Sequence, residues 1–141
     1  FTYNEEEQAF AETLYPTLSS PAYQLGDEQK IFDMDTSISM GSTDVGDISW
    51  NVPTAEFSTA TWVPGTPAHS WQAIAAGGTT IGIKGLQLAA KTMALTAADF
   101  FENPELAEKA HAELMAQRAA GFVYTPLLGD RAPALDYRLK Q

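Results

Sequence analysis

TIGIKGLQLAAKTMALTAADFF, residues 80–101, is the longest stretch of the chain in which apolar side chains recur at helical spacing. These side chains surround most of the helix circumference, which is typical of a helix buried between two layers of a fold. They are Ile81, Ile83, Leu86, Leu88, Met93, Leu95, Phe100 and Phe101. The stretch therefore predicts a long buried helix within a layered domain.

Residues 54–63, TAEFSTATWV, are rich in β-branched and aromatic side chains, which favours a strand. Residues 22–40 predict one short strand at most. A sheet usually needs three or more strands to be stable on its own. The order of helix, strand and long helix therefore predicts an α/β fold, part of whose sheet lies outside these residues.

Local signals define the remaining elements. Asn4 and Glu7 have the spacing of a capping box and predict a helix over 4–18. Asn103-Pro104-Glu105 predicts the start of a helix that ends near Gly121. We expect one domain, with an N-terminal helix in 1–20, a motif-bearing strand and loop region in 41–78, two helices in 80–120 and an irregular tail in 121–141.

Composition excludes several classes of partner. The 141 residues carry a net charge of −10, which disfavours nucleic acid and anionic membrane surfaces. No apolar run approaches the roughly 20 residues that span a bilayer. There is no cysteine, so disulfides and thiolate metal sites are excluded. We expect a cytoplasmic protein.

Two histidines are the candidate metal ligands or acid–base groups. His111 lies within the predicted helix after Pro104, and we interpret it as a solvated helix residue without a role. His69 follows a predicted strand and the turn Pro64-Gly65-Thr66-Pro67, in a loop of the kind that positions functional groups. A single loop histidine is more often structural, so both interpretations of His69 stay open at this point.

Asp44 and Asp47 are the second candidate set. Paired acids can orient a histidine or contact a cation, but such acids are more often structural, with Asp44 as the cap of a short helix and Asp47 as an exposed or N-terminal acid. Ser42 and Thr43 have the position of capping residues rather than of nucleophiles. A site for two cations needs several ligands and bridging carboxylates, so these residues contribute to such a site at most.

Three blocks of sequence resemble a known family. GSTDVGDISW at 41–50, Pro53-Thr54, and GTPAHSWQ at 65–72 are similar to the C-terminal region of the M20 family of metal-dependent amidohydrolases and peptidases, in the branch that acts on p-aminobenzoyl-glutamate. The resemblance continues through Lys84-Gly85 and the following helix into the tail. It departs from the family at Ile83, where relatives often have a histidine.

The resemblance implies a fold, a site and a reaction. The expected fold is part of a layered αβα zinc-peptidase-like catalytic domain, and these residues are its C-terminal portion. His69 is the expected metal ligand, with Asp44, Asp47, Ser42 and Thr43 supporting it. The metal is zinc or manganese, and its other ligands lie in an N-terminal half that is not among these residues.

Two functions follow as hypotheses. The first is a fragment of an amidohydrolase that cleaves a small-molecule amide to an amino acid, such as p-aminobenzoyl-glutamate, and that is inactive without its missing half or a homo-oligomer partner. The second is a non-catalytic assembly or binding domain derived from that family. An acidic net charge and an apolar helix that needs cover would fit the second hypothesis, as would a homodimer that pairs open sheet edges.

Overall fold

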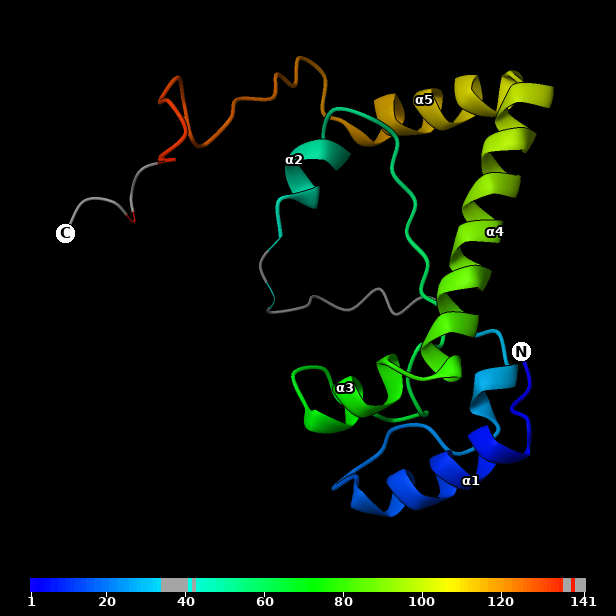
Figure 1. Ribbon diagram of the computed structural model, residues 1–141. Coiled ribbons are helices and arrows are strands. Elements are labelled where there is room, and N and C mark those ends of the chain that lie inside the picture. The colour runs from blue at the N-terminus through cyan, green and yellow to red at the C-terminus, as the bar shows by residue number, and fades with distance from the viewer. Residues whose placement is uncertain (34–40, 42, 136–137, 139–141) are drawn as a thin grey trace. The chain divides into compact units, whose positions relative to one another are not determined.

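The structure is a computed structural model that describes residues 1–33, 41, 43–135 and 138. Every regular element within these residues is a helix (Figure 1). The elements are α1 (Glu5–Leu14), η1 (Tyr15–Thr17), η2 (Asp27–Gln29), α2 (Val45–Ser49), α3 (Trp71–Gly77), α4 (Thr80–Glu102) and α5 (Glu105–Gln117). None of these helices combines the length and apolar character needed to cross a membrane.

The prediction of an α/β fold, and of a layered αβα domain, is wrong for the described residues. The segment 54–63 runs as irregular chain, and no strand forms between 22 and 33. β-Branched and aromatic side chains fit a half-buried pleated surface, and that preference is expressed only where a neighbouring strand completes the ladder. The described residues supply no such neighbour, so the segment packs through side chains instead.

The predictions for the three longer helices are confirmed. At α1 the Asn4 side chain accepts a hydrogen bond from the Glu7 backbone N–H, and the Glu7 carboxylate accepts one from the Asn4 N–H, both at 2.8 Å. This is the reciprocal arrangement of a capping box. Helix α4 coincides with the long apolar stretch, and α5 begins directly after Pro104.

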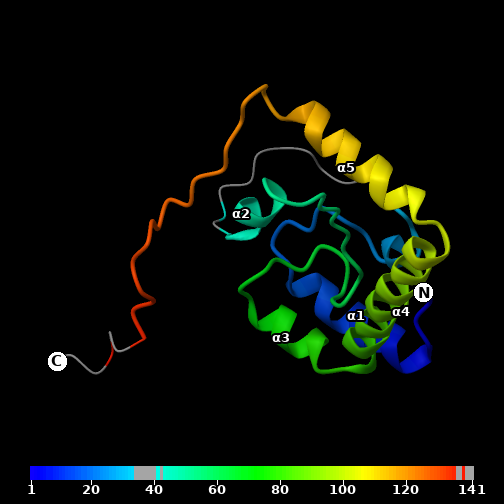
Figure 2. The same cartoon turned by 90° about the horizontal axis from the view of Figure 1, so that it is seen from above.

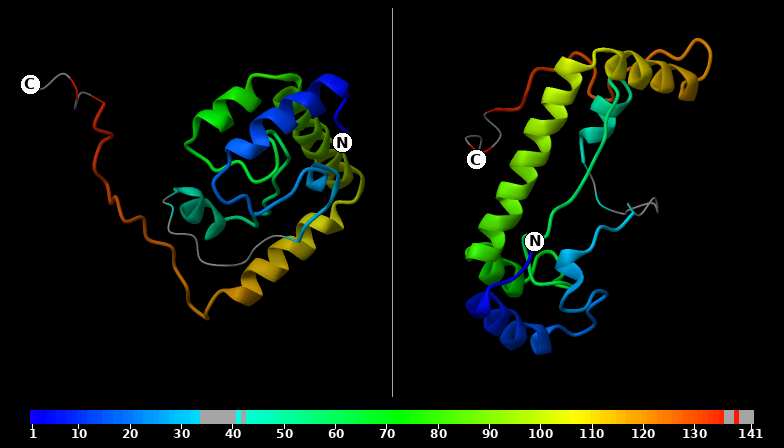
Figure 3. Two further views of the ribbon diagram at one scale, coloured as in Figure 1. Left: turned by 90° about the horizontal axis from the view of Figure 1, so that it is seen from below. Right: turned by 90° about the vertical axis from the view of Figure 1, so that its right-hand side faces the viewer.

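The chain divides into two compact units. Unit 1 consists of residues 1–38 and 56–104, and unit 2 of residues 39–55 and 105–141. Unit 1 therefore contains α1, α3 and α4, and unit 2 contains α2 and α5. Figure 3 shows that the described residues after α5 form no further helix; they are irregular chain with several turns.

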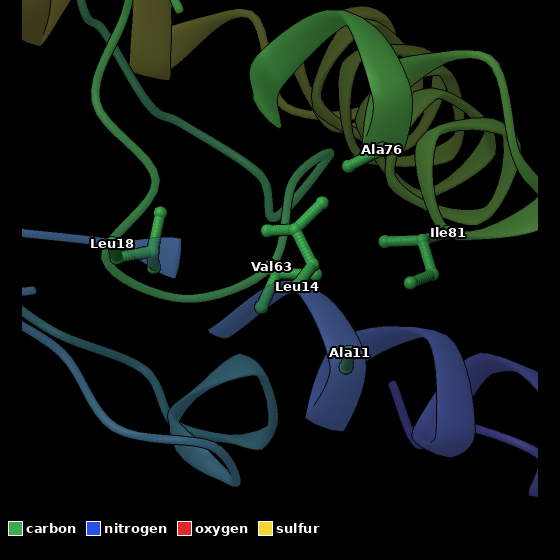
Figure 4. Packing of buried hydrophobic residues seen from close by; sticks show 6 residues of the cluster. All are labelled: Ala11, Leu14, Leu18, Val63, Ala76 and Ile81. Atoms are coloured by element: carbon green, nitrogen blue, oxygen red, sulfur yellow. The ribbon is translucent and has the colours of Figure 1, made fainter. Parts of the chain in front are cut away.

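The core of unit 1 lies where α1 and α3 meet the first turns of α4, an arrangement visible in Figures 1 and 2. Small and branched side chains from all three helices point toward one another there, together with Val63 from the irregular segment (Figure 4). The buried residues are Ala11, Leu14, Leu18, Val63, Ala76 and Ile81. Burial of their apolar surface is what holds the three helices together.

Glycine allows the irregular segment to approach α4 closely. A Cβ atom on Gly85 would lie 2.3 Å from the carbonyl oxygen of Ala60 and 2.7 Å from a methyl of Thr61. The hydroxyl of Thr59 donates a hydrogen bond of 3.0 Å to the Gly85 carbonyl oxygen. The segment predicted as a strand is thus held against the second turn of α4 by direct backbone contact.

The prediction that α4 is buried between layers is wrong beyond its first turns. Only Ile81, Gly82 and Gly85 of this helix are buried. The large apolar side chains further along are exposed, from 42% at Leu88 and Phe100 to 87% at Phe101. The apolar circumference reflects the composition of the helix, whereas burial requires facing layers that the described residues do not provide.

Candidate functional site

The candidate residues lie in different units, so each set is described within its own unit. His69 belongs to unit 1, whereas Thr43, Asp44 and Asp47 belong to unit 2. Ser42 lies outside the described residues.

His69 occupies the turn that leads into α3. Its φ angle is 59°, in the left-handed region that few residues other than glycine adopt. The Ser70 hydroxyl next to it donates to the Pro67 carbonyl oxygen at 2.7 Å and accepts from the Ala73 N–H at 3.1 Å, which caps α3. Since these bonds fix both sides of the turn, the exposed His69 side chain projects from a defined backbone position.

A shallow hollow with aromatic walls surrounds this side chain. It is lined by Trp62, Ala68, His69, Ser70, Trp71, Ala73 and Ile74. Trp71 and Ile74 are 61% and 81% exposed. Large apolar side chains that are exposed next to one another often mark a surface that binds a ligand or a partner. The hollow therefore combines one imidazole with accessible apolar surface.

The donor set decides whether these residues can hold a metal by themselves. Within the part of the chain that the structure describes, no group of three or more His, Cys, Asp or Glu side chains converges on a point. A two-cation centre needs several ligands, with carboxylates that bridge the ions. One imidazole does not fit such a centre alone, and no catalytic step is assigned to the described residues.

Gln72, in the same sequence block as His69, has a structural task that sequence reasoning missed. It is 9% exposed, and its Nε2 donates to the carbonyl oxygen of Thr17 at 3.2 Å and to the Thr17 hydroxyl at 3.3 Å. These bonds tie α3 to η1, the short helix that follows α1. A glutamine on the apolar side of a short helix is the only sequence signal for this contact.

In unit 2, Thr43 rather than Asp44 caps α2. Asp44 occupies the N-cap position, but its side chain makes no capping hydrogen bond. The Thr43 hydroxyl accepts a hydrogen bond of 3.2 Å from the Val45 N–H. Thr43 and Asp44 are both exposed, so the Asp44 carboxylate is available to solvent beside the helix start.

Asp47 contacts the tail. Its carboxylate accepts a hydrogen bond from the hydroxyl of Tyr124, and this bond, followed by desolvation, raises the pKa of Tyr124 above its ordinary value. The contact joins the first turn of α2 to residues that follow α5. Asp47 is exposed, but its interpretation as an acid without a role did not include this hydrogen bond with Tyr124.

An aromatic cluster extends this contact. Trp50 and Phe122 stack with ring centroids 5.0 Å apart and an interplanar angle of 26°, and the Arg118 guanidinium lies 5.4 Å from the Phe122 centroid. The cluster forms one side of a second hollow. That hollow is lined by Asp47, Trp50, Phe122, Val123, Tyr124, Thr125 and Leu127. Sequence reasoning identified only Asp47 of this set.

Glu7 is the most thoroughly buried charged group among the described residues of unit 1, with 3% of its surface exposed. Its carboxylate accepts hydrogen bonds from Lys84 Nζ at 2.5 Å, Thr80 Oγ1 at 2.6 Å and the Asn4 N–H at 2.8 Å. Burial alone would raise the pKa of Glu7, but these bonds outweigh it and hold the pKa below its ordinary value. Because the donors of these hydrogen bonds all belong to unit 1 itself, we assign Glu7 a structural role.

The other residues discussed from the sequence lie apart from both hollows. His111 is exposed on α5. Ile83, where a histidine is expected from the family resemblance, is 50% exposed on α4.

Comparison with known proteins identifies part of a hydrolase as a relative. The chain is 33% identical over 136 residues to one of the subunits of p-aminobenzoyl-glutamate hydrolase of Escherichia coli strain K12, and the match covers 79% of this chain. It spans 28% of the length of that relative. No family model and no solved structure matches the chain.

Proposed function

We propose that this chain is part of a metal-dependent amidohydrolase of the M20 type that cleaves p-aminobenzoyl-glutamate-like amides, and that His69 contributes one metal ligand. The similarity to the p-aminobenzoyl-glutamate hydrolase of E. coli carries the proposal, because it extends over 79% of the chain. The position of His69 supports it. An imidazole on a fixed turn, exposed within an aromatic hollow, is accessible to a cation and to an aromatic substrate.

The proposal requires ligands besides His69, since no group of three or more His, Cys, Asp or Glu side chains gathers among the described residues. We propose that these ligands come from outside the 141 residues. The partner is an N-terminal half of the catalytic domain or a second copy of the chain. Asp44 and Asp47, with Ser42 and Thr43, are proposed to support the site. The metal is zinc or manganese, which lends a bound water nucleophilic character in hydrolases of this class.

The test is metal retention in the assembled protein. The chain is produced with the N-terminal portion of the related hydrolase, and zinc and manganese per complex are measured after desalting. We expect His69→Ala to lower the retained metal at least roughly tenfold, because the neutral imidazole is a direct ligand. His111→Ala, which alters the other exposed histidine, should retain metal like the unaltered complex. Equal metal content in the two variants would show that His69 is not a metal ligand.

A second candidate function is an assembly or binding domain without catalysis. The observation that favours it is the apolar surface of α4, where Leu86, Met93 and Leu95 are each more than 60% exposed. Exposed apolar patches of this kind mark interaction surfaces. A complex that shows neither metal retention nor dependence on His69, but assembles through α4, would favour this function.

A further inference from the structure

We propose that Ser70 is a positioning residue for His69. Its hydroxyl closes the turn that holds the His69 backbone in the left-handed conformation, and the turn in that form presents the imidazole at the hollow beside Trp62. The use that is made of the imidazole rests on the proposed function. The conformation of the turn does not, and it can be measured in the chain by itself.

His69 has a backbone conformation that normally favours glycine. It is the only non-glycine residue with a positive φ among those that the structure describes. A side chain at such a φ brings its Cβ atom close to the following carbonyl oxygen, which costs free energy. Residues in this conformation persist where their surroundings hold them, and they gather at functional sites. A histidine in place of glycine therefore indicates that the side chain has a task there.

The chain is anchored on both sides of this turn. Before it, Gly65 packs so closely that a Cβ atom there would lie 2.5 Å from the Cβ atom of Pro21. After it, the Gln72 side chain donates to the carbonyl oxygen of Thr17 at 3.2 Å and fixes the first turn of α3. Only the short stretch 66–71 runs between these two anchors. A contact within this stretch is therefore sufficient to set the direction of the imidazole.

The Ser70 hydroxyl supplies that contact. It donates to the carbonyl oxygen of Pro67 at 2.7 Å and accepts from the N–H of Ala73 at 3.1 Å. Pro67 precedes His69 and Ala73 follows it, so a single side-chain oxygen joins the two sides of the strained residue. Without the hydroxyl, nothing offsets the cost of the positive φ, and we expect His69 to relax toward a negative φ.

The first experiment measures the φ angle of His69 by NMR in the 141-residue chain. The nuclear Overhauser effect between the amide and α protons of one residue is strongest at positive φ, because the two protons are then closest. We expect a strong effect at His69 in the unaltered chain and in Ser70→Thr, which keeps the hydroxyl. In Ser70→Ala it should fall to the level of Ala68, whose φ is negative.

Two further variants separate positioning from support of the helix. Gln72→Ala also removes a hydrogen bond of α3, but one that lies outside the turn, so it should lower the Tm and leave the strong effect at His69. Ser70→Gly removes the hydroxyl with a residue that the N-cap position tolerates well. It should lose the effect at His69 like Ser70→Ala, and it provides the test if Ser70→Ala unfolds α3. Circular dichroism reports the helical content of each variant.

The second experiment measures zinc affinity in the complex with the N-terminal portion of the related hydrolase, by competition with a chelator. Ser70→Ala should bind zinc roughly tenfold more weakly, as is typical when a group that orients a metal ligand is lost. Ser70→Thr and Gln72→Ala should bind zinc like the unaltered complex.

The outcomes distinguish this role from the proposed function. A strong effect at His69 in both Ser70→Ala and Ser70→Gly, or its loss in Gln72→Ala as well, would show that the hydroxyl does not hold the turn. A relaxed His69 with unchanged zinc affinity would show that the turn does not position a ligand. Zinc retained in His69→Ala would reject the proposed function, whereas the NMR measurement would still decide whether Ser70 sets the conformation of His69.

Discussion

The carboxylate of Glu7 accepts hydrogen bonds from Thr80 and Lys84, which follow it in the sequence by 73 and 77 residues. It thereby joins α1 to the start of α4 within unit 1. A buried ion pair contributes modest net stability, but the loss of one partner leaves the other group without compensation. Replacement of the Glu7 carboxylate by an amide should therefore change the free energy of unfolding measurably.

We expect Glu7→Gln to lower the free energy of unfolding by about 1–3 kcal/mol at neutral pH, because the amide cannot form the ion pair with Lys84. The pKa of Glu7 in the folded chain is below its ordinary value of 4.5. The contribution of the Glu7 carboxylate to the free energy of unfolding is thus fully present above pH 4.5. It is lost as the pH falls through the pKa of Glu7 in the folded chain. Urea unfolding should show a gap between the two proteins that is widest at neutral pH and closes in acid.

Glu6→Gln is the matched control, since Glu6 is exposed on the same turn of α1. Surface substitutions of this kind usually change stability by less than about 0.5 kcal/mol. If Glu7→Gln and Glu6→Gln unfolded alike at neutral pH, the ion pair would have no part in the stability of unit 1.

Among single residues, contacts between sequence neighbours could be predicted from the sequence, whereas contacts between distant residues could not. The capping box of Asn4 and Glu7 is local, with a spacing of three residues, and the sequence predicted it correctly. The contact between Asp47 and Tyr124 spans 77 positions, and no local pattern announces it. His69 was singled out from its place after a proline-bounded turn, and the structure adds its left-handed backbone and aromatic surroundings.

At the scale of elements, the three longer helices were predicted correctly, whereas the predicted strand was wrong and α3, which Ser70 caps, was missed. The internal backbone hydrogen bonds of a helix lie within its own residues, so a long helix carries enough local sequence signals to be predicted. A strand needs a partner, and the composition of 54–63 does not reveal whether one is present. What the segment has instead is a groove on α4, created by the absence of a side chain at Gly85.

Gly85→Ala should therefore destabilise the chain although alanine is the better helix former. Alanine gains about 1 kcal/mol over glycine within a helix. Its Cβ would lie 2.3 Å from the Ala60 carbonyl oxygen, and overpacking of this kind typically costs about 1–3 kcal/mol. We expect a lower Tm and a smaller free energy of unfolding, measured by circular dichroism with heat and urea.

Gly46→Ala is the control for the intrinsic preference. Gly46 lies in α2, and a Cβ there would have no neighbour within 4 Å. We expect this variant to be at least as stable as the unaltered chain. A Gly85→Ala protein that gains stability to the same extent would contradict the close contact between α4 and the irregular segment.

For the whole molecule, the amount of apolar surface and its placement do not match a self-sufficient fold. Hydrophobic residues make up 45% of the chain, yet the buried apolar residues among those described are few and lie between α1, α3 and the first turn of α4 (Figure 4). The sequence predicted the apolar length of α4 correctly and its burial wrongly, because burial depends on what faces the helix. The exposed positions Ile83, Leu86, Ala90, Met93, Ala97 and Phe100 follow one another at alternating intervals of three and four residues.

This spacing is that of a helix seam that packs against another helix, and the alanines allow close approach. We expect the 141-residue chain to self-associate through the seam, with a mass above 15.2 kDa in light scattering at high concentration. Leu86→Glu combined with Met93→Glu should shift the chain toward the monomer while its helical content is retained, because both side chains are more than 60% exposed. Gln87→Glu combined with Ala94→Glu adds the same charge at the same interval, one residue further round the helix, and should leave association in place. A chain that is monomeric at every concentration, or two double variants that behave alike, would show that the seam does not mediate assembly.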